Sequence, residues 1–320
     1  MADLQPLNLA EAIQPVSLRV HPPSSVIFLC GGLAKSEPPE LPESLRAAFL
    51  RLELPEEFKK YRIVVAEAAE PMLPVAGYRD LLTFESDIAG VVALILLFSE
   101  SPGSLAELGA FAALPNVASK LLVVIDDGYY EDSSFIRNGP IASLETYQGD
   151  EWVLVLDRED IGVGKEREIS NLDLQKLNEN VVPAAVQRLE YASSFERFDS
   201  DNDGHFILLL TGLVQLCGAL TITELKSIIE HLGFPKAQGR ISNFLYCSEL
   251  MGWMKKTKKG NHTYYVCRPG EDAIDFTAKQ QAKIKEKVRW KAEFRAHWQK
   301  EDKPRFRAIS ELSIENENVE

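Results

Sequence analysis

The hydrophobic pattern of the first half of the chain alternates between short apolar runs and segments with helical spacing. Apolar runs without polar alternation are typical of strands that are covered on both faces. They occupy residues 26–30, 91–98 and 121–125, and residues 61–66 and 152–156 predict two further strands. Between them, helical spacing predicts covering helices at residues 44–52, 78–89 and 171–191. We therefore expect an α/β fold: a Rossmann/flavodoxin-like parallel sheet of about five strands with flanking helices.

The pattern changes after Gly204. Residues 205–220 predict an apolar helix, residues 221–224 open a second helix through a capping box, and residues 237–251 predict a third. Residues 253–266 read as a basic hairpin that turns near Gly260. This order predicts a winged helix-turn-helix domain. The expected parts are an N-terminal extension (1–24), a first domain (25–195), the winged helix (205–270), a basic C-terminal helix (271–308) and a disordered acidic tail (309–320).

Charge separates the two halves. The chain of 320 residues has a net charge of −13, yet residues 236–307 contain a large excess of Lys and Arg. The first domain should therefore repel nucleic acid, while the second should attract it. Docking to protein and a merely solvated lysine loop are the alternatives. The candidate nucleic-acid contacts lie on the third helix and the hairpin: Lys236, Gln238, Arg240, Asn243, Lys255, Lys256, Lys258 and Lys259.

Metal and disulfide chemistry are not expected. The four cysteines are scattered, and the five histidines lack ligand spacing. Residues 199–204 resemble the start of an EF-hand loop, but Leu210 stands at the twelfth position, where calcium needs a glutamate. We find no secretory signal or spanning segment in the sequence, so a reducing cytoplasm is the expected location.

The strongest candidate for chemistry follows the central predicted strand. Residues 100–111 read Glu-Ser-Pro-Gly-Ser-Leu-Ala-Glu-Leu-Gly-Ala-Phe. We expect Ser104 to cap the next helix and Glu107 to lie in its first turn, where the helix dipole favours a carboxylate that could attack a sugar carbon. The same spacing is typical of a capping box, in which Glu107 only bonds back to the Ser104 backbone.

Two other predicted strand ends should meet at the same edge. Gly31 and Gly32 follow the first strand, and their lack of side chains would let a phosphate or sugar approach the backbone. Asp126 follows the run 121–125. Because open parallel sheets bind ligands at the carboxyl ends of their strands, these loops predict one binding site.

Three blocks resemble a known family. Residues 26–32 (Val-Ile-Phe-Leu-Cys-Gly-Gly), the block 81–111, and residues 134–140 with Ser-Phe-Ile and Gly-Pro closely resemble retron effectors of the nucleoside deoxyribosyltransferase-like kind. The resemblance implies an N-glycosidase domain at 25–195 and a winged-helix half. It also implies a toxic arm of an anti-phage system, with a reverse transcriptase and its multicopy single-stranded DNA/RNA as partners, and we expect an oligomer in that complex.

The resemblance also implies site residues. Glu107 falls on the catalytic carboxylate, and the substrate-binding positions are Phe28, Cys30, Gly31, Gly32, Glu85, Ser101, Pro102, Gly103, Ser104, Asp126 and Asn138. Phe28 replaces a tyrosine common in deoxyribosyltransferases, and Ala93 and Ser101 stand where aspartates are frequent. These departures disfavour base exchange and favour hydrolysis of NAD, which is then a substrate, with no cofactor.

Two alternatives remain. One is a non-catalytic, nucleotide-sensing DNA-binding regulator, and the other is a phosphoribohydrolase resembling the cytokinin-activating enzymes, whose glycine-rich loop is half matched by residues 102–107.

Overall fold

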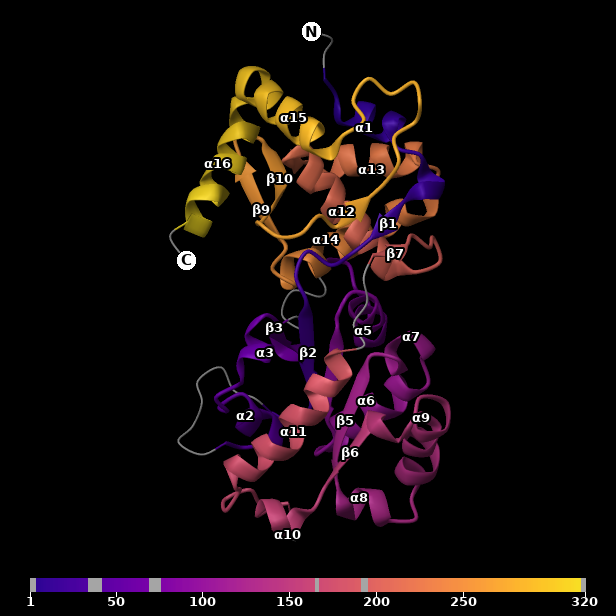
Figure 1. The fold of residues 1–320 in the computed structure, drawn as a ribbon, viewed down its shortest axis with the longest axis vertical. Coiled ribbons are helices and arrows are strands. Elements are labelled where there is room, and N and C mark those ends of the chain that lie inside the picture. The colour runs from indigo at the N-terminus through magenta and orange to yellow at the C-terminus, as the bar shows by residue number, and fades with distance from the viewer. Residues whose placement is uncertain (1–3, 34–41, 69–75, 165–166, 191–194, 318–320) are drawn as a thin grey trace. The chain divides into compact units, whose positions relative to one another are not determined.

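The computed structural model describes the chain except for residues 1–3, 34–41, 69–75, 165–166, 191–194 and 318–320. The chain forms two units, each built from segments that are discontinuous in sequence (Figure 1). Unit 1 comprises Met1–Ser24, Pro71–Val91 and Ser193–Glu320. Unit 2 comprises Ser25–Glu70 and Val92–Ala192. The predicted first domain, 25–195, therefore contains a segment whose contacts belong to unit 1.

Unit 2 contains a five-stranded parallel sheet, which confirms the predicted sheet. In spatial order the strands are β3 (Arg62–Val65), β2 (Val26–Cys30), β4 (Leu94–Phe98), β5 (Leu121–Asp126) and β6 (Val153–Leu156). Every residue of β2, β4 and β5 is buried, in agreement with their unbroken apolar sequences. The strand order reverses between β2 and β4, and open α/β sheets bind ligands outside the carboxyl ends at such a point.

Helices complete unit 2. Its other elements are α2 (Leu45–Phe49), α3 (Glu56–Lys59), η2 (Ala66–Ala68), α6 (Pro102–Ala112), α7 (Pro115–Ala118), α8 (Asp127–Glu131), η4 (Arg137–Ile141), α9 (Ala142–Tyr147), η5 (Asp150–Trp152), α10 (Arg158–Ile161) and α11 (Leu174–Leu189). One apolar cluster joins a face of the sheet to α2 and α11, through residues such as Leu29, Leu96, Phe49 and Val181. Helix α11 continues through Pro183.

Unit 1 is built around the buried helix α12 (Asp203–Cys217). It also contains α1 (Pro6–Ala12), η1 (Pro15–Ser17), β1 (Arg19–Val20), α5 (Leu81–Ala89), β7 (Glu196–Arg197), β8 (Ala219–Leu220), α13 (Ile222–His231), η6 (Pro235–Arg240), α14 (Ile241–Leu250), β9 (Met254–Lys259), β10 (His262–Cys267) and β11 (Ile274–Asp275). Thr221 and Glu224 form the predicted capping box of α13. Strands β9 and β10 form the predicted hairpin, which turns at Gly260 with a φ of 60°.

The N-terminal segment and the helix before the central strand both differ from expectation. Residues 1–24 are part of unit 1, because β1 pairs with β7 and β11 and Ile13 bridges to Ala278. Helix α5 belongs to unit 1 as well, where Asp87 accepts hydrogen bonds from Tyr78 (2.5 Å) and Arg240 (2.6 Å). These pairings link residues far apart in sequence, so no local pattern indicated them.

The C-terminal region also departs from the prediction. The basic C-terminal helix expected within residues 271–308 begins only at Lys287, as α15 (Lys287–Glu301). The expected disordered tail is instead largely helical, because α16 (Lys303–Glu317) includes most of residues 309–320. Helix α16 buries Ala308, Ile309 and Leu312, and it packs against β8, β9, β10 and α15. Its acidic composition concealed this narrow apolar face.

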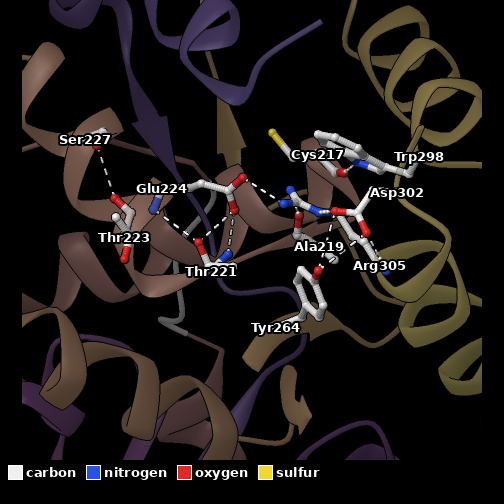
Figure 2. A network of polar contacts seen from close by, with 10 residues as sticks. All are labelled: Cys217, Ala219, Thr221, Thr223, Glu224, Ser227, Tyr264, Trp298, Asp302 and Arg305. Carbon is white, nitrogen blue, oxygen red and sulfur yellow. Dashed lines mark hydrogen bonds and ion pairs between the residues drawn. The ribbon is translucent and has the colours of Figure 1, made fainter. Parts of the chain in front are cut away.

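Arg305 fixes the start of α16 to the rest of unit 1. Figure 2 shows its guanidinium between Glu224 of α13 and Asp302, which it contacts at 2.8 and 3.0 Å. The same guanidinium lies 4.0 Å from the centre of the Trp298 ring, and the Trp298 indole donates to the Cys217 carbonyl at 2.7 Å. This largely buried network joins α12, α13, α15 and α16.

Candidate functional site

A cavity of about 200 Å³ lies in unit 2 at the carboxyl ends of β2, β4 and β5. Its polar lining residues are Gly32, Glu43, Ser44, Glu100, Ser101, Asp126 and Arg167, and its apolar ones are Leu33, Leu45, Val163 and Ile169. The predicted convergence of three strand ends is therefore present. Gly32, Ser101 and Asp126 were expected there, whereas Glu43, Glu100 and Arg167 were not identified from the sequence.

Glu100 organises one wall of this cavity. Its carboxylate accepts hydrogen bonds from the backbone N–H groups of Gly32 (3.1 Å), Leu45 (2.5 Å) and Arg46 (3.1 Å). Burial raises the pKa of the Glu100 carboxyl, while these three hydrogen bonds act in the opposite direction. The Gly32 amide, which we expected to bind a substrate phosphate, is thus occupied by a carboxylate of the chain itself. In the sequence, the one feature of Glu100 that could have indicated this role is its position between a predicted strand and a predicted helix.

The glycine pair is required by close packing. A Cβ atom on Gly32 would lie 2.7 Å from Glu100 Oε1 and 2.9 Å from Ser44 Cβ. Gly31 has a φ of +141°, and a Cβ atom there would lie 2.8 Å from the Cβ of Phe98. Both positions therefore exclude a side chain, as the sequence predicted, but the groups that approach them belong to the protein.

The start of α6 differs from the prediction. Ser101, and not Ser104, is the N-cap residue, and its hydroxyl accepts from the Ser104 N–H at 3.2 Å. The Ser104 hydroxyl in turn accepts from the Ser101 and Glu100 amides at 2.9 and 3.0 Å. Glu107 consequently lies beyond the first turn, so both the first-turn dipole argument and the capping-box role for Glu107 are wrong.

Glu107 is half-buried, and its Oε2 atom is buried. Ser104 and Glu107 are three residues apart, so they lie on the same side of α6. Glu107 does not belong to the lining residues of the cavity described above, although its helix begins at the lining residue Ser101. Glu107 thus lies on the helix whose N-cap residue lines the cavity, but it is not part of the cavity lining.

The other predicted substrate positions are dispersed. Phe28 and Cys30 are buried within β2, and Pro102 and Gly103 are exposed in the first turn of α6. Asn138 is exposed in η4, a π-helical segment of a kind that is frequent at functional sites. Glu85 is buried in α5, within unit 1.

Asp126 and Arg167 form the opposite wall of the cavity. Arg167 Nε donates to Asp126 Oδ2 at 2.8 Å, and its guanidinium lies 3.6 Å from the centre of the Tyr129 ring. Asp126 is buried and also caps α8 by accepting from the Tyr129 amide at 3.1 Å. Arg167 has a φ of +61°, a strained value for a residue with a side chain. Its loop has no periodic pattern, so no feature of the sequence indicated that Arg167 belongs to the cavity.

Most of the predicted nucleic-acid residues are engaged within unit 1. Arg240 pairs with Asp87 and Asp203, Asn243 is buried, and the Gln238 amide donates to Glu230 at 3.1 Å. Asn243 is therefore unavailable as a nucleic-acid contact, while Arg240 is partly exposed but held in two ion pairs. The competing contacts come from α5 and the start of α12, which local sequence cannot place.

Because side chains alternate between the two faces of a strand, the four hairpin lysines fall into two pairs. Lys255 pairs with Glu315 at 2.7 Å, and Lys259 pairs with Glu311, both glutamates being on α16. Lys256 and Lys258 are exposed. The side chain of Lys236 lies outside the described residues.

Comparison with known proteins identifies the family. Residues 42–256 match the model of the STM3845 retron effector protein family, and the chain belongs to that family. It is 38% identical over 78 residues to the "Retron Ec86 putative ribosyltransferase/DNA-binding protein" of Escherichia coli, a match covering 24% of this chain and 25% of the relative. It is 27% identical over 162 residues to the "Retron Ec73 putative ribosyltransferase/DNA-binding protein" of the same organism, a match covering 47% and 48%. The matches thus span at most about half of each relative.

Two features are absent from the part of the chain that the structure describes. No helix in this part of the chain is long and apolar enough to cross a membrane. Within the same residues, no three His, Cys, Asp or Glu side chains gather closely enough to hold a metal ion.

Proposed function

We propose that this protein is the toxic effector of a retron anti-phage system and that unit 2 cleaves the N-glycosidic bond of NAD or a related nucleotide. The supporting observation is the polar cavity at the carboxyl ends of β2, β4 and β5. Membership of a retron effector family and the ribosyltransferase named in two relatives agree with glycosyl transfer. The whole activity remains our proposal.

In the proposed reaction, Glu107 attacks or electrostatically stabilises the anomeric carbon as its bond to the nicotinamide nitrogen breaks. The electron pair of that bond stays with the ring, which leaves as neutral nicotinamide. A water molecule then adds its oxygen to the anomeric carbon and releases the carboxylate, and one proton of that water passes to the solvent. Because the leaving ring needs no proton, a general acid is not required.

The cavity residues suit a cationic ring. The cavity lining contains one basic side chain, Arg167, and three acidic side chains, Glu43, Glu100 and Asp126. A positively charged nicotinamide ring would be favoured beside them, and loss of its charge would accompany bond cleavage. Ser101 and Arg167 supply donors for sugar hydroxyls or a phosphate. Glu100, fixed by three backbone amides, is proposed as a positioning residue for this wall.

The test is nicotinamide release from NAD by the purified full-length protein, freed of inhibitory partners. We expect Glu107→Gln to lower the rate by about a thousandfold or more. Glu57→Gln, which changes an exposed residue of α3, is the matched control and should leave the rate unchanged. If Glu107→Gln retains full activity, Glu107 is not the nucleophile.

For unit 1, we propose a winged helix-turn-helix function that binds the retron reverse transcriptase and its multicopy DNA and thereby restrains the enzyme. The order of α12, α13, α14 and the hairpin supports it, as does the DNA-binding function named in both relatives. A wild-type protein that binds nucleic acid but releases no nicotinamide would instead support a nucleotide-sensing regulator.

A further inference from the structure

A second cavity, of about 470 Å³, lies in unit 1 beside the hairpin. Its polar lining includes Gln215 of α12, Arg268 after β10, Lys291 and Arg295 of α15, and Ser313 of α16. Among the described residues that line it, none is acidic. The cavity therefore combines three cationic side chains without a carboxylate in its wall.

The cations come from two directions. Lys291 and Arg295 are four residues apart on α15, so they project from the same face of that helix. Arg295 is exposed, and its guanidinium lies 5.7 Å from the centre of the Phe306 ring. Lys291 contacts Asp272 at 2.5 Å, which partly offsets its charge. Arg268 faces the same cavity from the chain that follows β10.

Helix α16 separates this cavity from the hairpin lysines. Ile309 and Ser313 line the cavity, while Glu311 and Glu315 pair with Lys259 and Lys255. The cavity nevertheless lies close to the hairpin lysines, because its lining residue Val266 is opposite Lys255 in the register of the hairpin. A phosphate approaching Lys255 or Lys259 would have to displace Glu315 or Glu311 from its ion pair. At the cavity, by contrast, Lys291 pairs with a carboxylate, Asp272, while Arg295 is exposed.

We infer that this cavity binds the phosphodiester backbone of a nucleic acid strand and supplies the main phosphate contacts of unit 1, in place of Lys255 and Lys259. The inference rests on the nucleic-acid function proposed for unit 1 and is independent of the glycosidase chemistry. Arginine guanidinium groups match phosphate oxygens in charge and geometry. Contacts to phosphate carry no sequence information, so binding should vary little with base sequence.

The experiment measures binding of the full-length protein to fluorescein-labelled single-stranded DNA and RNA of identical sequence at several salt concentrations. Three variants each lower the net charge by two: Arg295→Glu in the cavity, Arg289→Glu elsewhere on α15, and Lys255→Gln combined with Lys259→Gln in the hairpin. We expect Arg295→Glu to weaken binding about tenfold and to reduce the salt slope by about one. The other two should weaken it by about twofold or less.

The outcomes distinguish the two proposals. If the wild-type protein binds neither oligonucleotide, the nucleic-acid function of unit 1 fails and the inference fails with it. If it binds but the three variants weaken binding equally, or the hairpin variant weakens it most, only the cavity assignment is overturned. Binding of ATP tests whether the cavity takes a free nucleotide. If the protein binds ATP but neither oligonucleotide, and Arg295→Glu abolishes ATP binding, the assignment of the cavity to a nucleic acid backbone is overturned.

Discussion

At the scale of single residues, the main feature of the candidate site is a carboxylate that the chain binds with its own amides. Glu100 gathers the backbone N–H groups of residues 32, 45 and 46, which come from two separate segments. Donors of this kind commonly bind anions. Here the three amides hold the Glu100 carboxylate in the cavity wall. Because this carboxyl is buried, loss of any of the three hydrogen bonds would be costly in free energy.

Gly32 in this wall and Gly103 in the first turn of α6 should respond in opposite ways to the same substitution. Gly32→Ala places a Cβ atom 2.7 Å from Glu100 Oε1, so we expect a loss of about 1–3 kcal/mol in the free energy of unfolding. Gly103→Ala, in the first turn of α6, meets only Ser101 Oγ at 3.8 Å and should stabilise by up to about 1 kcal/mol. Urea denaturation checks both, and a neutral Gly32→Ala would contradict the packing described.

The capping of α6 shows what residue patterns leave open. Ser101 and Ser104 are three residues apart, and either serine fits an N-cap by sequence. The choice depends on where β4 ends and on the Glu100 amide, which donates to the Ser104 hydroxyl. The local spacing of residues predicted the helix, but the end of β4 determined which residue begins it.

At the scale of elements, the start of α16 is held to the rest of unit 1 by a buried polar network. Arg305 is buried and contacts Glu224, Asp302 and the Ala219 carbonyl, the last at 3.3 Å (Figure 2). Removing one member of a buried ion network leaves the remaining charges without their partner, which costs more than the network itself contributes.

We therefore expect Arg305→Met to lower the free energy of unfolding by about 2–4 kcal/mol. Hydrogen exchange should show faster exchange in α16, because its first turn would lose the contact to α13. The matched control is Arg289→Met on α15, whose exposed pair with Glu293 at 3.5 Å should contribute less than about 0.5 kcal/mol. Equal effects of the two substitutions would contradict the structural role of Arg305.

At the scale of the whole molecule, the chain crosses between the units at residues 24–25, 70–71, 91–92 and 192–193. Unit 1 needs β1 to complete its small sheet and α5 to pair Asp87 with Arg240. The unit proposed as a winged helix is therefore not complete in the contiguous segment 205–270.

A fragment of residues 193–320 should consequently lack cooperative unfolding, because it exposes surfaces that the segments 1–24 and 71–91 cover in the full chain. A fragment of residues 25–192 contains every segment of unit 2 and serves as the control, which should unfold cooperatively. Near-UV circular dichroism during thermal unfolding distinguishes them. A cooperative transition of the 193–320 fragment would show that the N-terminal segments are dispensable.

The sequence by itself determined the features that depend on neighbouring residues. Apolar runs specified the buried strands β2, β4 and β5, Thr221 and Glu224 specified a helix start, and Gly260 marked the hairpin turn. Each of these follows from backbone geometry or burial over a few consecutive positions.

Only the tertiary structure decided which charges face solvent and which face one another. Arg240 is paired with Asp87, 153 residues away, and Lys255 with Glu315, 60 residues away. Arg167, 41 residues from Asp126, completes the cavity of unit 2. Ion pairs act through space at distances of a few ångströms, independently of sequence separation, so a pattern of residue types cannot reveal them.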